Sequence, residues 1–150
     1  MIHRIEIAKS VLFDAVRDET AQHFRAMRVR TEGADSAYED MVVTEVDYPA
    51  LSARLDALVS SIYADIRGYT PEYMLTEDMV GFAVDMRDCN GGARVAPLLQ
   101  QVMEQQLLAW WYNVRMPDLA AQYVQGAEST MSAIRSAVIP VFGNRKLRMF

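Results

Sequence analysis

Two stretches with helical apolar spacing follow one another with a two-residue linker, and this feature constrains the fold most. Between Arg94 and Val114 apolar residues recur every three or four positions, and Pro97 falls in the first turn, where proline is tolerated. The second stretch begins at Pro117, a favourable first helical position, and ends before Pro140. Because so short a linker turns one helix back along the other, the sequence predicts an antiparallel helical hairpin.

Two further helices are expected in the first half of the chain. One covers Arg4 to Arg28, where apolar residues approximate a single helical stripe. The other begins at Thr44, a good N-cap residue that can form a capping box with Asp47 three positions later. Gly68 and Pro71 are typical of a helix end, so this second helix stops before them.

A minor β element is expected near residues 79–86, because apolar residues alternate at period two over Val80–Met86. A short helix capped near Thr76 is the alternative, and the glycine-rich stretch Asn90–Gly92 predicts a turn. A lone strand cannot satisfy its own backbone, so it needs a partner, either Val138–Phe142 or the same segment of another subunit. The predicted fold is mainly α, with about four helices in a single domain spanning 1–150, and with a basic tail at about 143–150.

The composition places the chain among soluble proteins. It has 150 residues, 51% of them hydrophobic, and no apolar run approaches the length of a membrane span. Charges interrupt the first twenty residues too often for a secretion signal. Cys89 is the only cysteine, which suits a reducing compartment. We therefore expect a cytoplasmic protein without membrane contact that is not secreted.

Charge is distributed unevenly along the chain. Residues 1–30 carry a net charge of +2, residues 31–90 carry −10, and residues 91–150 carry +3. An extended nucleic-acid contact needs a basic surface, and the acidic centre argues against one. Two basic clusters are nevertheless candidates for such a contact: Arg25, Arg28 and Arg30, and Arg145, Lys146 and Arg148.

No catalytic or metal-binding pattern is recognisable. His3 and His23 would lie about 30 Å apart along one helix, too far to share a metal ion. The acidic stretch that begins at Asp85 lacks the glycine and glutamate positions of a calcium loop. Cys89 has no nearby histidine, and no phosphate-binding or dinucleotide-binding loop occurs. We expect neither an enzyme nor a bound metal or cofactor.

Three adjacent aromatic residues, Trp110, Trp111 and Tyr112, end the longest apolar pattern. In a helix they fan over roughly 200°, more than one core-facing stripe covers. Trp110 continues the apolar stripe, so Tyr112 is expected to point elsewhere. Either other helices enclose all three rings, or part of the cluster contacts another chain; Trp111, Tyr112 and Arg115 are the candidate interface. A ligand pocket lined by Trp110, Trp111 and Met103 is a further alternative.

Two segments carry a resemblance to a known class of proteins. The stretches "GADSAYEDMVVTEVDYPALSARL" and "QQLLAWWYNVR" resemble parts of small virion-structural proteins, from head–tail connector or tail modules, of Bacteroidetes phages and prophages. The resemblance covers about residues 35–138, and its motifs are short. The matching positions are Asp35, Ala37, Tyr38, Glu39, Thr44 and Asp47.

The resemblance implies a structural role in a head–tail or tail assembly and supplies no catalytic residues. The implied partners are further copies of this chain or neighbouring virion proteins, and the acidic centre and basic ends can complement one another head to tail. The alternatives are a helical ligand-binding domain or enzyme, and a small nucleic-acid-associated regulator.

Overall fold

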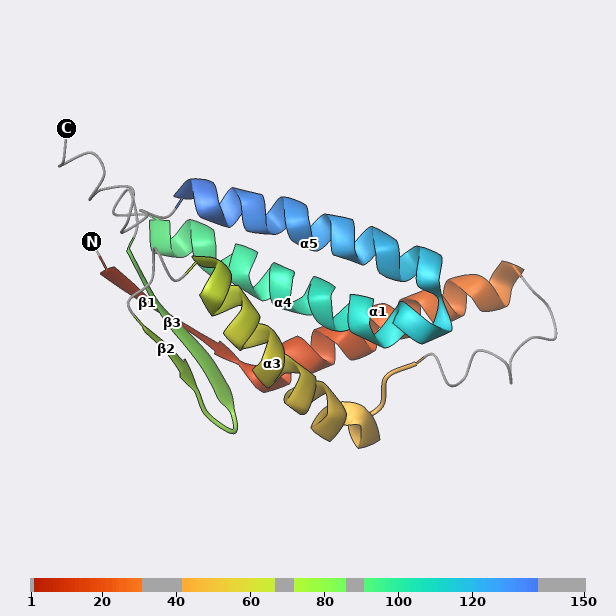
Figure 1. Cartoon of the computed structure of the whole chain (residues 1–150). Coiled ribbons are helices and arrows are strands. Elements are labelled where there is room, and N and C mark those ends of the chain that lie inside the picture. The colour runs from red at the N-terminus through yellow and green to blue at the C-terminus, as the bar shows by residue number, and fades with distance from the viewer. Residues whose placement is uncertain (1, 31–41, 67–71, 86–90, 138–150) are drawn as a thin grey trace.

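The computed structural model describes residues 2–30, 42–66, 72–85 and 91–137. In these residues four long helices stand beside a three-stranded antiparallel sheet (Figure 1). The fold is therefore mainly helical with a minor β element, as predicted. The elements are β1 (Ile2–Ala8), α1 (Lys9–Arg30), the 3-10 turn η2 (Glu45–Asp47), α3 (Tyr48–Ile66), β2 (Glu72–Leu75), β3 (Met79–Asp85), α4 (Gly91–Arg115) and α5 (Pro117–Ala137).

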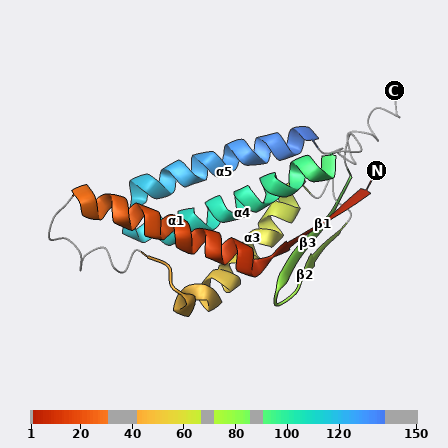
Figure 2. The same ribbon diagram turned by 180° about the vertical axis from the view of Figure 1, so that it is seen from behind.

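Helix α4 lies at the centre of the helical layer. Helix α5 runs back along it, and α1 and α3 flank it on opposite sides (Figures 1 and 2). Only Met116 separates the two C-terminal helices, and its amide donates to the carbonyl oxygen of Tyr112 at 2.7 Å. The predicted antiparallel hairpin is confirmed. The predicted turn is wrong at Gly91 and Gly92, which form the start of α4, while Asn90 lies outside the described residues.

Gly126 of α5 lies against the side chain of Gln105 on α4. A Cβ atom at this position would lie 2.8 Å from Nε2 of Gln105, so the end of the glutamine side chain would have to move. The Thr130 hydroxyl lies 2.9 Å from both Oε1 of Gln105 and the Gly126 carbonyl oxygen. A polar contact between Thr130 and Gln105 therefore joins the two helices of the hairpin.

The first strand corrects the prediction of one helix over Arg4–Arg28. Residues Ile2–Ala8 form β1, and α1 begins only at Lys9. Within β1, Ile5 and Ile7 are buried while Arg4 and Glu6 are exposed, which is the period-two alternation of a strand. The apolar residues of β1 and of α1 also fit one helical stripe, so the sequence did not show that a strand ends at Ala8 and a helix begins at Lys9.

The predicted strand near residues 79–86 is confirmed as β3, but its predicted partners are wrong. It is the middle strand of the sheet, between β1 and β2. Ile5 lies opposite Phe82 and Ile7 opposite Val80, so four buried side chains face the helices. The alternative helix near Thr76 is also excluded, because Thr76 belongs to the turn between β2 and β3. Val138–Phe142 lies outside the described residues.

A buried lysine ties the sheet to α3. Lys9 Nζ lies 2.9 Å from Oδ1 of Asp56 and 3.3 Å from Oγ of Ser52, both on α3. Its amide donates to the carbonyl oxygen of Asp78 in the β2–β3 turn at 2.9 Å. Because a buried ammonium is costly without a partner, this ion pair keeps the start of α1 aligned with α3.

The start of α3 follows the predicted capping pattern with one difference. The Thr44 amide donates to Oδ2 of Asp47 at 3.0 Å, as in a capping box. The first turn, Glu45–Asp47, is a 3-10 turn rather than α-helix, and α3 proper begins at Tyr48 with Pro49 in its first turn. Helix α3 ends at Ile66, and the predicted stop signals Gly68 and Pro71 lie outside the described residues.

One continuous core joins the helices to the inner face of the sheet. Leu99 and Val102 on α4 and Leu55 on α3 are completely buried. Exposure differs strongly along α4: Leu99 is completely buried, whereas Val114 near the end of the helix is 86% exposed. Side chains of the same helix therefore differ widely in their expected contribution to stability.

We expect Leu99→Ala to lower the free energy of unfolding by about 2–5 kcal/mol, since truncation leaves a cavity in a closely packed site. Val114→Ala is the matched control on the same helix and should change it by less than about 0.5 kcal/mol. Urea unfolding followed by circular dichroism measures both. A Leu99→Ala loss as small as that of the control would contradict the described core.

Candidate functional site

The three adjacent aromatic residues are distributed between the core and the surface differently from the prediction. Tyr112 is completely buried, Trp111 is 5% exposed, and Trp110 is 37% exposed. The prediction that Trp110 faces the core and Tyr112 points away is wrong. Residues of α1 and α5 pack on Tyr112: the His23 ring meets it edge-on, and the Tyr123 ring stacks on it at 6.1 Å. The face with Trp110 lies where α3 and α5 leave α4 uncovered.

Of the three candidate interface residues, only Arg115 is exposed. Its guanidinium carbon lies 3.8 Å from the centre of the Trp111 ring, and its Nη1 donates to the Trp111 carbonyl oxygen at 2.8 Å. A cation over an indole face in this way is stabilising. The side chains of Trp111 and Tyr112 are therefore buried, and the exposed side chain of Arg115 packs over the Trp111 ring.

A polar network connects α1 to α5 beside Tyr112. The Tyr123 hydroxyl donates to Oε1 of Glu19 at 3.0 Å and lies 2.8 Å from Nε2 of His23. Since that hydroxyl has one proton, which goes to Glu19, Nε2 of His23 must carry the proton of the second bond. Burial, and then the charge of Glu19, raises the pKa of Tyr123. Neutral tyrosine thus holds the two helices together.

The Tyr112 hydroxyl stands apart from this network. It is buried and has no hydrogen-bond partner among the residues that the structure describes. Burial, with a smaller contribution from the charge of Glu19, raises the pKa of Tyr112 to about 12. Burial also raises the pKa of another group on α4, the half-buried carboxyl of Glu104. An unsatisfied buried hydroxyl is costly, so the ring rather than the hydroxyl stabilises this position.

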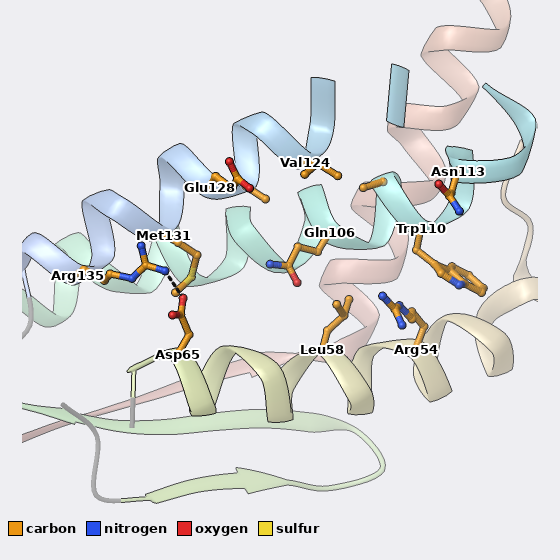
Figure 3. Close-up of a pocket in the computed structure, with 12 residues that line it drawn as sticks. Arg54, Leu58, Asp65, Gln106, Trp110, Asn113, Val124, Glu128, Met131 and Arg135 are labelled. Atoms are coloured by element: carbon orange, nitrogen blue, oxygen red, sulfur yellow. Dashed lines mark hydrogen bonds and ion pairs between the residues drawn. The ribbon is translucent and has the colours of Figure 1, made fainter. Parts of the chain in front are cut away.

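A groove of about 710 Å³ lies between α3, α4 and α5. Buried apolar side chains from all three helices line it, and Trp110 and Val124 border it while remaining exposed (Figure 3). The residues that line it are Arg54, Leu58, Asp65, Gln106, Ala109, Trp110, Asn113, Val124, Ala127, Glu128, Met131 and Arg135.

Charged residues mark the two ends of the groove. Arg54 lies beside Trp110 at one end, and an ion pair between Asp65 and Arg135 bridges α3 and α5 at the other (Figure 3). Eleven positions separate Arg54 from Asp65 on α3. At a rise of 1.5 Å per residue, the groove is about 16 Å long, or three helical turns. It fits a short helix or an apolar segment lying along α4.

The sequence contains little that predicts this groove. The predicted pocket combined Trp110 with Trp111 and Met103, but only Trp110 lines the groove, and Met103 is completely buried in the core. Val124 is an apolar residue of α5 and is nevertheless 47% exposed. The groove joins side chains more than forty positions apart, so the periodicity of one helix cannot reveal it. The only local signal was the excess of aromatic rings over one apolar stripe.

Comparisons with models of protein families, with curated proteins and with solved structures found no match. In the part of the chain that the structure describes, no helix is sufficiently long and apolar to cross a membrane. Over the same residues no three histidine, cysteine or acidic side chains are grouped as a metal site requires. The likeness to virion proteins therefore stays a prediction from the sequence.

The two stacked tyrosines should respond oppositely to loss of their hydroxyls. Tyr112→Phe should leave the free energy of unfolding unchanged or slightly raised, because it removes an unsatisfied buried group. Tyr123→Phe should lower it by about 1–2 kcal/mol, because Glu19 and His23 lose a hydrogen-bond partner. Urea unfolding at neutral pH compares them, and equal losses in both variants would contradict the described network.

Alkaline pH should distinguish Tyr112 as well. Its pKa is about 12 in the folded chain and about 10 in an unfolded one, so folding favours the neutral form. The resulting stabilisation is complete below pH 10 and is lost as pH rises towards 12. Wild type should therefore lose up to about 3 kcal/mol more than Tyr112→Phe across this range. Urea unfolding at both pH limits tests this, and parallel losses would show that Tyr112 ionises freely.

Proposed function

We propose that this chain is a structural assembly protein of a phage or prophage virion, and that it binds a helix of a neighbouring virion protein in the groove between α3, α4 and α5. The observation that carries the proposal is the exposed pair Trp110 and Val124 beside the buried apolar side chains that line the groove. Tryptophan is enriched among the residues that contribute most to protein interfaces. The head–tail setting rests on the sequence resemblance.

The shape of the groove favours a helix as the occupant. Two helices, α3 and α5, form the walls, which diverge from the Asp65–Arg135 ion pair towards Arg54 and Val124, and α4 forms the base. Along α3 the groove is about three turns long. A helix laid in such a groove places side chains at positions i, i+4 and i+7 on the base. The buried apolar residues Leu58 on α3 and Ala127 and Met131 on α5 line the groove beside this base and can contact them.

The charges of the rim define the chemistry of that helix further. Arg54 and Arg135 are balanced by Asp65 and Glu128, so the rim as a whole carries no net charge. An amphipathic helix with an apolar stripe, flanked by residues of both signs, complements this surface. Most of the lining side chains are exposed, whereas a pocket for a small molecule encloses most of its ligand. The open form therefore favours a protein segment.

The test uses the full chain and the proteins encoded beside its gene, among which the proposal expects portal, capsid or tail proteins. Each is co-expressed with the chain, and the affinity of any complex is measured by calorimetry. Trp110→Ala should weaken binding at least about 30-fold, which corresponds to about 2 kcal/mol for a central anchor. Val114→Ala is the control, because it removes a still more exposed apolar side chain of α4 that lies outside the groove.

Two results would count against the proposal in different ways. If none of the neighbouring virion proteins binds the wild-type chain, the assembly role is wrong. If one binds and Trp110→Ala binds as tightly as Val114→Ala does, the role stands and the groove is not the site. Thermal unfolding of both variants shows whether a loss of binding reflects a loss of folding.

A further inference from the structure

The sheet has an open edge, and this edge lies apart from the groove. In the described residues β1 pairs only with β3, so one side of its seven-residue backbone faces no other strand (Figure 2). The opposite edge, β2, has only four residues. Unpaired edge backbone readily accepts a further strand. β1 is therefore the longer of two surfaces to which the sheet can be extended.

A hollow of about 310 Å³ adjoins this edge. It lies between β1, the first turns of α1 and the beginning of α4, and its lining includes Ile7, Val11 and Pro97. Val11 is 48% exposed although it is a large apolar residue directly after the strand. A strand added to β1 would lie over this hollow and cover Val11. The open backbone and the apolar surface thus coincide.

The charges of β1 indicate which strand fits. Arg4 and Glu6 are exposed on the outer face, and Ile5 between them is buried towards the helices. If a second copy of β1 pairs antiparallel with Ile5 opposite its equivalent, Arg4 of each copy lies opposite Glu6 of the other. Opposite charges directly across an antiparallel pair stabilise it, and like charges destabilise it.

Other symmetric registers lack this complementarity. In a two-fold symmetric pair, the helices of both copies lie on the same side of the sheet only if the pair is centred on a residue. In each such register, outward-facing residues lie opposite outward-facing residues. Centring the pair on Arg4 places two arginines opposite each other, and centring it on Glu6 places two glutamates opposite. An edge protected against self-pairing carries charges of one sign, which repel in every register. β1 instead carries a self-complementary pair.

We propose that this chain forms a two-fold symmetric homodimer in which the β1 strands pair antiparallel about Ile5, giving a continuous six-stranded sheet. The Arg4–Glu6 pairs select the register, and the added strand covers the hollow beside Val11. The partner is a second copy because the charge pattern complements itself. The dimer leaves the groove between α3, α4 and α5 open, so it goes beyond the proposed function and does not depend on it.

Charge reversal tests the register directly. Arg4→Glu and Glu6→Arg each convert both cross-strand attractions into repulsions, so each should raise the dimer dissociation constant roughly tenfold or more. The doubly swapped variant, Arg4→Glu with Glu6→Arg, should dimerise like wild type because both pairs are restored. Glu45→Arg is the control for Glu6→Arg, since it makes the same change of charge at an exposed position in η2, outside β1.

Mixing the two single variants gives a second measurement. At positions 4 and 6, Arg4→Glu carries two negative charges and Glu6→Arg carries two positive charges. The two variants should therefore form a heterodimer with each other, while each pairs with itself only weakly. Sedimentation gives the dissociation constants, and native mass spectrometry separates the heterodimer because the variants differ in mass. Thermal unfolding confirms that each variant is folded.

The proposal fails on any of three results. Wild type that sediments as a monomer up to its solubility limit shows that the β1 edge does not pair. A dimer that both single reversals leave as tight as the Glu45→Arg control shows that the interface lies elsewhere. Single reversals that weaken the dimer without rescue by the double swap show that the register is wrong.

Discussion

Burial of α4 on several sides is the constraint on which the rest of the structure depends. Its apolar residues contact α5 along the hairpin, α1 and α3 on opposite flanks, and β1 at the sheet. Such a helix needs an apolar surface wider than a single stripe, and the residues from Leu99 to Tyr112 supply it. The other helices and the sheet are each held mainly by what they cover on α4, so its surface decides where each one lies.

Polar contacts then fix how the outer elements are aligned. Lys9 pairs with Asp56 and sets the start of α1 against α3, while Tyr123 joins α5 to Glu19 on α1. Each contact involves groups that would be costly to bury or leave unpaired, so a helix that slides along α4 loses them. Apolar burial provides most of the stabilisation, and these contacts select one arrangement among several of similar burial.

The same arrangement leaves two surfaces unused. Because α3 and α5 both pack on α4 with a gap between them, Trp110 stays exposed in the groove. Because β3 is the middle strand, β1 ends the sheet with its backbone open. Neither surface could be predicted from the sequence. The aromatic run did indicate that one ring would lie outside the core, but it could not show which one, since that depends on which flank of α4 another helix covers.

What the sequence determined by itself was local. The spacing of apolar residues from Arg94 onwards, and Pro117 at the start of the next helix, were sufficient for the hairpin, because neighbouring helices with a short linker have few ways to pack. Alternation likewise determined that β3 is a strand. Only the tertiary structure decided that Ile2–Ala8 is a strand as well, since Ile5 pairs with Phe82, far away in the sequence. The physical reason is that backbone hydrogen bonds close within a helix but join distant segments in a sheet, so a strand is settled only by its partner.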